Sequence, residues 1–340
     1  MMARRITSQD VAREAGVSQS AVSRVYTAGA SVSPAMEARV RTAAAALGYR
    51  PNVLARSLIT GRSRIIGLVV AYLDNPFFAD AVEKLSHALQ AQGYHLLMFT
   101  VGNSGADLDR VVDELMDYQV DGLIAASVDL SGDLVRRCAS AGLPVVLFNR
   151  GIDGSGLSAI TSANRLGGRG AAEFLLAGGH QSIAQITGWQ GSSTGRDRAE
   201  GFRDALRAAG TDVHAEADGA YRRAVACERV REMMDRPDPP DAIFVGNDYM
   251  ALAVMDVLRS DLGVSIPDEV SVIGYDDISI AAWPAYDLTT IRQPVRRMIS
   301  ATVAEILARI ETPGRHPQRI EIEGPLVVRG SARLPEGQTR

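Results

Sequence analysis

Residues 7–25 of the chain read TSQDVAREAGVSQSAVSRV, and this stretch predicts two short helices joined by a tight turn. Thr7 is a good N-cap for the first helix, and Asp10 follows near the positive end of the helix dipole. Gly16 ends that helix, and Ser18 caps the second. Two short helices with a glycine in the turn between them are typical of a helix–turn–helix.

A third helix is expected after Ser33, an N-cap followed by the favoured N1 proline, and it ends at Gly48. In a helix–turn–helix the second helix enters the major groove of DNA, and its N-terminal residues contact base edges. Here those residues are Gln19, Ser20 and, one turn later, Arg24. Glutamine pairs with adenine and arginine with guanine, so these side chains suit base recognition. The alternative interpretation is a solvated helix face with an incidental arginine.

The composition is that of an ordinary folded protein with an uneven charge distribution. The 340 residues predict two or three domains, and 46% of them are apolar and 22% charged. The formal charge is −4, but residues 1–64 carry ten arginines against three acidic residues, a local charge of +7. A basic head on an acidic body indicates a polyanionic partner for the head. No apolar run has the length of a membrane span or a signal-peptide core, so we expect a cytoplasmic protein without a membrane partner.

Five motifs of the head keep one order and spacing: DVA (10–12), AGVS (15–18), VSRV (22–25), LGYRPN (47–52) and ARSL (55–58). With them the head resembles the DNA-binding region of the LacI/GalR family of bacterial transcriptional repressors. The sequence departs from the family at Ala21, where threonine is common, and at Thr27, where asparagine is usual. The resemblance implies that each departure removes a contact with the DNA backbone, which shifts operator affinity and leaves the fold intact.

Residues 51–64 connect the head to the rest of the chain. Pro51 and Asn52 predict the start of a further short helix, although a peptide of this length is not helical alone. By resemblance to the family this is the hinge helix, which becomes ordered when it pairs with its dimer mate on DNA. The resemblance places Ala55 and Leu58 at the DNA, with Leu58 as a wedge in the minor groove. The alternative is a plain linker with Leu58 packed on the body.

From residue 65 the pattern changes to short apolar strands that alternate with helices. Strands are expected at residues 65–70, 94–99, 122–126, 145–148, 183–187, 213–216, 242–245 and 270–275. Helices are expected near residues 77–92, 106–118, 130–141, 165–177, 196–209, 221–234, 248–260 and 295–310. This alternation predicts parallel sheets covered by helices on both faces. Two such sheets resemble the periplasmic-binding-protein core of the same family.

The predicted fold class is therefore an all-α helix–turn–helix head followed by an α/β body of two doubly wound parallel-sheet subdomains. The predicted domains are 1–50 for DNA binding, 51–64 for the hinge helix and linker, and 65–340 for effector binding and dimerisation. Within the body, we expect an N-subdomain of about 65–161 and 291–322 and a C-subdomain of about 162–290 and 323–335.

Ligands of open parallel sheets bind beyond the carboxyl ends of the strands, where this chain carries polar and aromatic residues. The effector-binding candidates are Asp74, Asn75, Phe77, Phe78, Ser127, Asn149, Trp189, Arg198, Asn247 and Asp276. Aromatic faces with a few hydrogen-bonding groups are typical of a small-molecule pocket. Arg198, Asn247 and Asp276 also match positions that bind effector in many members of the family. Asn149 stands where many members carry aspartate.

The candidates also have structural interpretations. The two phenylalanines suit a hydrophobic core. Asp248 and Asp277, which lie beside the candidates, suit helix caps as well as ligands, and Arg196 suits an exposed surface. For Arg198 and Asp276 the alternative is a mutual salt bridge.

The sequence predicts a homodimeric transcriptional regulator, a repressor that binds a near-palindromic operator in double-stranded DNA. A small-molecule effector, a sugar or sugar-like compound, is expected to control it from the cleft between the subdomains. Effector-driven release and effector-driven binding of the operator both fit these residues. The C-terminal residues lack leucine heptads, which predicts a dimer rather than a tetramer.

The alternative is a cytoplasmic small-molecule-binding protein or an enzyme on the same α/β body. Residues 167–170 are rich in glycine but fit neither the dinucleotide fingerprint nor the phosphate loop. The five histidines form no pair at metal-ligand spacing, and Cys138 and Cys227 lie far apart. We therefore expect no catalytic residues, no cofactor and no metal.

Overall fold

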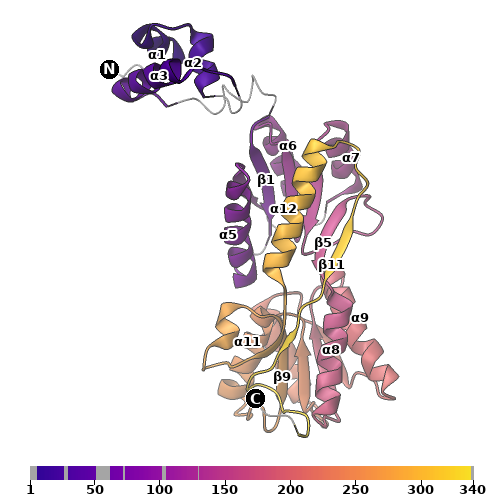
Figure 1. Ribbon diagram of the computed structural model, residues 1–340. Helices are drawn as coiled ribbons and strands as arrows, with labels where there is room; N and C mark the ends of the chain where they lie inside the picture. The colour runs from indigo at the N-terminus through magenta and orange to yellow at the C-terminus, as the bar shows by residue number, and fades with distance from the viewer. Residues whose placement is uncertain are drawn as a thin grey trace. The chain divides into compact units, whose positions relative to one another are not determined.

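The computed structural model describes residues 6–26, 30–50, 62–71, 73–101, 105–128 and 130–337. It contains two compact units, Met1–Ser63 and Arg64–Arg340 (Figure 1). Thr27 and most of the expected hinge segment, with Ala55 and Leu58, lie outside the described residues.

The first unit contains the helices α1 (Ser8–Ala15), α2 (Gln19–Val25) and α3 (Pro34–Leu47). Each begins at the expected N-cap, because the side chains of Thr7, Ser18 and Ser33 accept hydrogen bonds from backbone N–H groups of the first turn. Helices α1 and α3 end at Gly16 and Gly48, whose φ angles of 63° and 65° are left-handed. Glycine adopts this conformation without steric cost, so the predicted helix ends are confirmed.

A small apolar core holds these three helices together. Val11 of α1 and Val40 of α3 are fully buried, and Val22 and Val25 of α2 pack into the same cluster with Ala44. The spacing of these residues places them on the inner faces of the helices. Gln19 and Ser20, the first two residues of α2, are left exposed to solvent.

The second unit contains two six-stranded sheets. The first has the strand order β2, β1, β3, β4, β5, β11, and all neighbours are parallel. Its strands are β1 (Ile65–Val70), β2 (His95–Thr100), β3 (Gly122–Ala126), β4 (Val145–Phe148), β5 (Ser158–Ser162) and β11 (Arg319–Ile322). Its helices are α5 (Pro76–Ala91), α6 (Gly105–Asp117), α7 (Gly132–Ser140) and α12 (Val295–Glu311).

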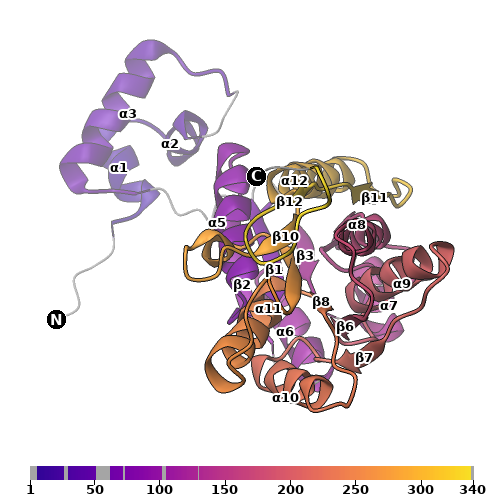
Figure 2. The same cartoon turned by 90° about the horizontal axis from the view of Figure 1, so that it is seen from below.

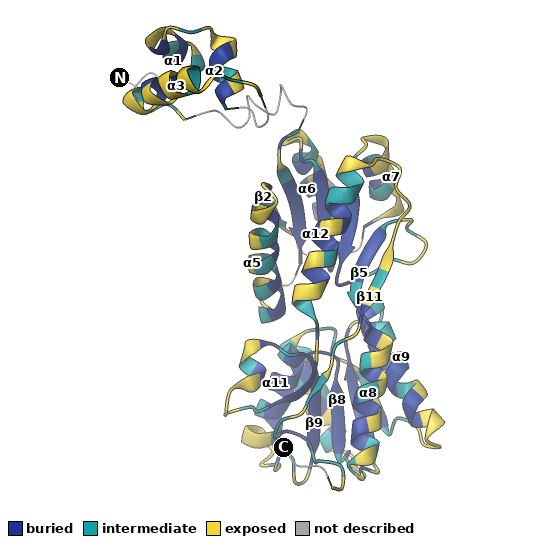
Figure 3. Ribbon diagram, viewed as in Figure 1, coloured by how far each residue is buried: buried dark blue, intermediate teal, exposed yellow. Residues whose placement is uncertain are grey.

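Strand residues of this sheet alternate between two cores, one on each face. Leu68 and Val70 of β1 pack into the cluster that contains Leu85 of α5 and residues of α12. Val69 between them packs with Val112 of α6 on the opposite face. Both faces of the central strands are therefore buried, as the apolar runs predict (Figure 3).

The second sheet has the strand order β7, β6, β8, β9, β10, β12. Its strands are β6 (Ile183–Thr187), β7 (Ala215–Asp218), β8 (Ala242–Val245), β9 (Ser271–Asp276), β10 (Thr289–Arg292) and β12 (Leu326–Val327). Its helices are α8 (Asn164–Ala177), α9 (Ser193–Ala208), α10 (Arg223–Met234) and α11 (Asp248–Asp256), followed by a π-helical turn at Val257–Asp261. Helices α8 and α9 cover one face, and α10 and α11 cover the other (Figure 2).

Some elements differ from the expectations. The strands β5, β10, β11 and β12 were not expected, since they are short and carry few consecutive apolar residues. β7 begins at Ala215, two residues after the expected start at Val213. β12 pairs antiparallel with β10, so the second sheet is not wholly parallel. Pairing with a neighbouring strand, rather than local sequence, creates these elements.

The chain passes between the two sheets three times: after β5, after β10 and after β11. We call the sheet of β1–β5 and β11 with its helices the first subdomain, and the other sheet with its helices the second subdomain. Helix α12 packs against α5 and the first sheet, as expected from the sequence. Two doubly wound subdomains are thus connected at one edge.

Candidate functional site

An open cavity is lined by residues of both subdomains at the carboxyl ends of their strands, and its empty space, including the part open to solvent, is about 430 Å³. Its lining residues are Asp74, Asn75, Phe77, Phe78, Ser127, Asn149, Arg150, Thr194, Arg198, Tyr221, Asn247, Asp276 and Gln293. Nine of the ten effector-binding candidates therefore lie together, and Trp189 does not belong to the lining.

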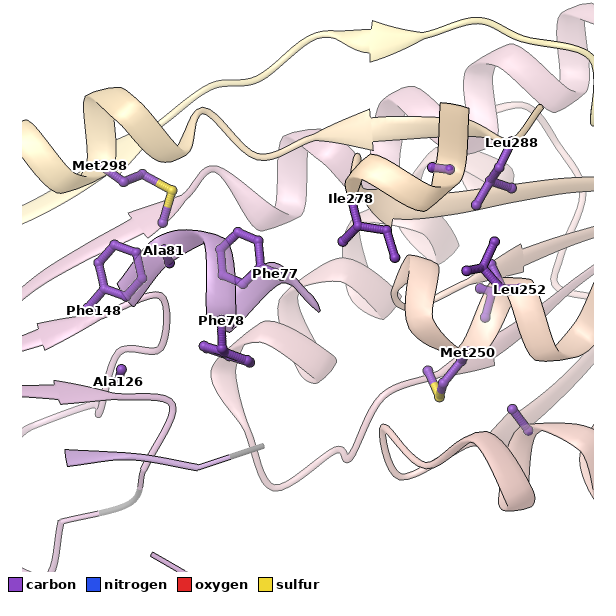
Figure 4. Close-up of a cluster of buried hydrophobic side chains, with 14 of the residues drawn as sticks. Phe77, Phe78, Ala81, Ala126, Phe148, Met250, Leu252, Ile278, Leu288 and Met298 are labelled. Carbon is purple, nitrogen blue, oxygen red and sulfur yellow. The ribbon is translucent and has the colours of Figure 1, made fainter. Parts of the chain in front are cut away.

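The first turn of α5 forms part of the first-subdomain wall. Asn75 caps this helix, because its Oδ1 accepts a hydrogen bond of 3.1 Å from the backbone N–H of Phe77. The rings of Phe77 and Phe78 meet edge to face with centroids 5.2 Å apart. Both rings are buried in the core near Phe148 and Met298 and also line the cavity (Figure 4). The core interpretation is therefore confirmed, and both phenylalanines also line the cavity.

Ser127 and Asn149 follow β3 and β4 on the same wall. Both have left-handed backbones, with φ angles of 55° and 70°. Asn149 Nδ2 donates a hydrogen bond of 2.9 Å to Ser127 Oγ. The Oδ1 of Asn149 is buried and has no hydrogen-bond partner among the described residues. Because Asn149 also lines the cavity, this oxygen is a candidate acceptor for a ligand.

Arg198 and Asp276 form the charged centre of the second-subdomain wall. Arg198 Nη1 lies 3.4 Å from Asp276 Oδ1, and each side chain is 3% exposed. Arg198 also donates to the backbone carbonyl of Gly246 at 2.7 Å and to Asn164 Oδ1 at 2.9 Å. Its guanidinium lies 3.6 Å from the ring centroid of Tyr275. The pair is both a buried salt bridge and part of the cavity wall.

Asp276 ends β9 in a strained position, with a φ of 126° that aspartate rarely adopts. Gln293 Nε2 donates a hydrogen bond of 2.7 Å to Asp276 Oδ1. Burial raises the pKa of Asp276, and the charge of Arg198 opposes that rise. Asn247 caps α11 through a hydrogen bond of 2.9 Å from the Met250 N–H and also lines the cavity.

Asp248 and Asp277 have structural partners outside the cavity lining. Asp248 is fully buried, and its oxygens accept hydrogen bonds from Thr290 Oγ1 at 2.6 Å and the Ile278 N–H at 2.9 Å. Burial raises the pKa of Asp248 to about 7, and the negative charge of Asp276 adds to the rise. Asp277 instead accepts hydrogen bonds of 2.6 Å from the guanidinium groups of two arginines, Arg292 and Arg329.

Trp189 is the candidate that the structure places elsewhere. Its side chain is 40% exposed, and its ring lies 5.5 Å from the guanidinium of Arg150. The ring is not part of the cavity lining, to which Thr194 of α9 belongs instead. Arg196 is on the surface, as its alternative interpretation predicts, and donates to Asp153 Oδ2 at 3.1 Å.

Sequence reasoning missed Thr194, Tyr221 and Gln293 as lining residues. Tyr221 follows β7, whose expected position was two residues too early, and Gln293 follows β10, which was not expected. The glycine at position 188 indicates that another side chain packs closely there, because a Cβ at Gly188 would overlap the Tyr221 ring. Arg150, adjacent to the candidate Asn149, is buried in the same wall.

The DNA-binding candidates of α2 share an exposed surface. Gln19, Ser20 and Arg24 are all exposed, whereas the apolar residues of α2 are buried. Gln19 Nε2 donates to Ser8 Oγ at 3.0 Å, and Ser20 Oγ lies 2.9 Å from Ser18 Oγ. The side chains that the sequence assigns to base contacts are therefore accessible on the described part of the first unit.

None of the helices in the described ranges combines the length and the apolar character that crossing a membrane requires. Among the same residues, no group of three or more His, Cys, Asp or Glu side chains is arranged to hold a metal ion.

Known proteins match both units of the chain. Residues 7–52 match the family described as bacterial regulatory proteins, lacI family, and residues 63–330 match periplasmic binding proteins and sugar binding domain of LacI family. The HTH-type transcriptional regulator CelR of Thermobifida fusca is 35% identical over 339 residues, which cover 96% of this chain and 98% of the relative.

Solved structures give the same result. The transcriptional regulator CelR–cellobiose complex has a TM-score of 0.73 and 33% identity, and covers 96% of this chain and 100% of that chain. The Lac repressor dimer bound to operator and the anti-inducer ONPF has a TM-score of 0.88 and 27% identity, and covers 96% of this chain and 99% of that chain.

A helix–turn–helix followed by two doubly wound subdomains with a cavity between them defines a DNA-binding protein with a ligand-binding domain. The chain belongs to the LacI family of bacterial regulatory proteins. Its function is DNA-binding transcriptional regulation.

Proposed function

We propose that this regulator represses transcription and that a sugar or sugar-like effector in the cavity controls its operator binding. The observation that carries the proposal is the chemistry of the two walls. Arg198 and Asp276 offer a donor and an acceptor on one wall, and Asn149 offers an acceptor on the other. The rings of Phe77 and Tyr221 add apolar faces. A ring with several hydroxyl groups fits such a set of contacts, and the solved CelR structure contains cellobiose.

Two buried amide oxygens of the lining strengthen this assignment. Asn149 Oδ1 and Gln293 Oε1 have no hydrogen-bond partner among the described residues. A buried acceptor without a partner costs roughly 1–3 kcal/mol. Hydroxyl groups of a bound ligand would donate to both oxygens and remove that cost.

A thermal-shift screen of sugars, polyols and nucleobases on the full chain tests the proposal. A ligand at about 100 times its dissociation constant adds about 2.7 kcal/mol to the free energy of unfolding. We expect sugars to be among the stabilising compounds, and the same compound in a gel-shift assay decides whether it releases or promotes operator binding. Stabilisation by nucleobases alone would contradict the sugar assignment.

We propose that α2 enters the major groove and directs Gln19, Ser20 and Arg24 toward base edges. Their common exposure supports this arrangement. By family resemblance, Ala55 and Leu58, outside the described residues, contact DNA from the hinge segment.

Arg24→Ala tests the recognition role of α2. We expect a loss of about 1–3 kcal/mol in binding free energy for the cognate operator and little change for random DNA, because only the operator presents the paired base. Arg13→Ala is the control, because Arg13 is an exposed arginine on α1. An equal loss on both DNAs would reassign Arg24 to the phosphate backbone.

We propose that the active species is a homodimer, as in the solved Lac repressor complex. β2 is an edge strand of the first sheet, and its Met98 is 42% exposed. Tyr118 is 56% exposed and lies against Phe99 of the same strand, with ring centroids 6.4 Å apart. Exposed apolar residues along a free sheet edge are typical of an interface with a second copy. Sedimentation at micromolar concentration should show a dimer, and Met98→Lys should shift it toward monomer.

We further infer that the cavity binds its ligand without catalysis. Among the described residues, the lining contains no histidine or cysteine. Ser192, two residues before the lining residue Thr194, donates to the carbonyl of Trp189 at 2.7 Å and accepts from the Gly195 N–H at 3.1 Å. Its hydroxyl is thus part of a helix cap. Recovery of a stabilising compound unchanged after long incubation supports this inference, and turnover would refute it.

A further inference from the structure

Two loop segments, one from each subdomain, contact each other beside the cavity. In the first subdomain residues 150–153 follow β4, and in the second subdomain residues 189–196 connect β6 to the first turn of α9. We call these two segments together the clamp. Its position at the edge of the cavity makes it a candidate regulator of ligand affinity.

Three contacts cross the clamp, and they follow one another along both segments. The Arg150 guanidinium lies 5.5 Å from the ring centroid of Trp189. The Gly151 N–H donates a hydrogen bond of 3.0 Å to Ser193 Oγ. Arg196 Nη2 donates to Asp153 Oδ2 at 3.1 Å. The two segments are thus joined by an aromatic contact, a hydrogen bond and an ion pair in series.

Each side of the clamp is continuous with a cavity wall. Asn149 and Arg150 line the cavity from the first subdomain, and Thr194 lines it from the second. Ser192 Oγ accepts the Gly195 N–H at 3.1 Å, so the first turn of α9 is a capped unit that carries both Thr194 and Arg196. A displacement of Arg196 relative to Asp153 therefore moves Thr194 relative to Arg150.

We propose that Asp153 and Arg196 are positioning residues for effector binding, which act by holding Arg150 and Thr194 at the spacing that a bound effector needs. Closing the clamp favours the ligand-competent arrangement, and opening it lowers the apparent affinity by reducing the population of that arrangement. This proposal rests on the assignment of the cavity as the effector site.

The two arginines that bind Asp153 provide a matched pair of variants for the test. Arg319 of β11 donates to Asp153 Oδ1 at 2.9 Å and to the backbone carbonyl of Ile152 at 2.8 Å, and all three residues belong to the same subdomain. Arg196 contacts the same carboxylate from the other subdomain. Loss of either arginine removes one hydrogen bond from Asp153, and only the loss of Arg196 removes a contact between the subdomains.

The ion pair of the clamp is accessible to solvent. Arg196 is 38% exposed and Asp153 is 64% exposed, and both line a second, open hollow with Gly151 and Ser193. Exposed ion pairs are weak and screened by salt. Loss of this pair should change the population of the closed arrangement by up to about fivefold at low salt, and by less at high salt.

The first experiment needs no effector. Acrylamide quenching of Trp189 is measured in full-length chain that carries Trp283→Phe, which removes the second of the two tryptophans. Arg196→Gln should increase quenching by at most about twofold, because the loss of the ion pair frees a ring that is already 40% exposed. Arg319→Gln should leave it unchanged, and Arg196→Lys should restore most of the protection. Equal quenching in the Arg196→Gln and Arg319→Gln variants would overturn the proposal.

The second experiment measures effector affinity by calorimetry, with the sugar that gives the largest thermal shift in the wild-type screen. Arg196→Gln should weaken binding by about two- to fivefold at low salt, and Arg319→Gln should not. A merely structural role would lower the melting temperature of both variants and leave affinity unchanged. If no sugar binds wild type, the effector assignment fails while the quenching result still decides whether the clamp joins the subdomains.

Discussion

The two walls of the cavity present different kinds of polar group to a ligand. The second-subdomain wall contains buried charges, Arg198 and Asp276, that satisfy one another and neighbouring groups before any ligand arrives. The first-subdomain wall also contains charged residues, Asp74 and Arg150, but its neutral residue Asn149 keeps an acceptor without a partner among the described residues. Arg198 and Asp276 should therefore contribute to stability and binding together, and Asn149 mainly to binding.

The largest expected effect is on stability, from Arg198→Met. The substitution leaves the carboxylate of Asp276 buried without its cation, which typically costs about 3–5 kcal/mol. Urea unfolding of the full chain without ligand measures the loss. A loss below about 1 kcal/mol would show that the pair is not needed for stability and would remove the contrast between the walls.

The pH dependence of stability provides the next test. The pKa of Asp248 is about 7 in the folded chain, well above the value of about 4 for an unfolded aspartate. The folded state therefore binds more protons between these values, so the free energy of unfolding falls as pH rises from about 4 to 7 and then levels off.

Asp248→Asn should remove the contribution of Asp248 to the pH dependence of stability. The free energy of unfolding, measured by urea unfolding at each pH, should then vary less between about pH 4 and pH 7. A first-wall variant, Asn149→Gly, should keep the wild-type slope, because the amide does not titrate. An unchanged slope in Asp248→Asn would assign the proton uptake to another group.

Asp276→Asn should weaken both binding and stability. It replaces an acceptor oxygen with a donor, and the mismatch costs roughly 1–3 kcal/mol, or about five- to a hundredfold in effector affinity. The same change disturbs the contacts with Arg198 and Gln293, so the melting temperature without ligand should also fall. Calorimetric titration and a melt of one preparation measure both quantities. Wild-type affinity in the variant would remove Asp276 from the ligand site.

Asn149→Gly should have the smallest effect on stability. Glycine adopts the φ of 70° without strain, and the substitution removes the hydrogen bond to Ser127 Oγ, so the free energy of unfolding should change by less than about 1 kcal/mol. Effector affinity should fall by about three- to tenfold, because the free acceptor is removed. A large loss of stability with unchanged affinity would reverse the roles of the two walls.

Much of the fold is readable from local sequence. Thr7, Ser18 and Ser33 place the starts of three helices, because a cap acts within one turn and needs no distant partner. The strands with continuous apolar runs, such as Ile65–Val70, occur where expected, since burial on both faces demands that pattern. The short strands at the far edge of each sheet follow no such pattern.

The candidate site likewise contains residues that the local sequence predicts and residues that it does not. The residue types that follow the apolar strands identify Asn247, Asp276 and Asn149 as lining residues, because the carboxyl ends of parallel strands meet at one edge. The sequence by itself thus determined the helix–turn–helix, the doubly wound body and most of the cavity wall.

Only the tertiary structure decided which neighbouring side chain turns inward. Trp189 contacts Arg150 outside the lining, while Thr194 of the next helix takes the place at the cavity. Tyr221 and Gln293 reach the lining from strands whose limits depend on their pairing partners. Local sequence determines where a cap or a buried run lies, but the direction of a loop side chain depends on the packing of segments distant along the chain.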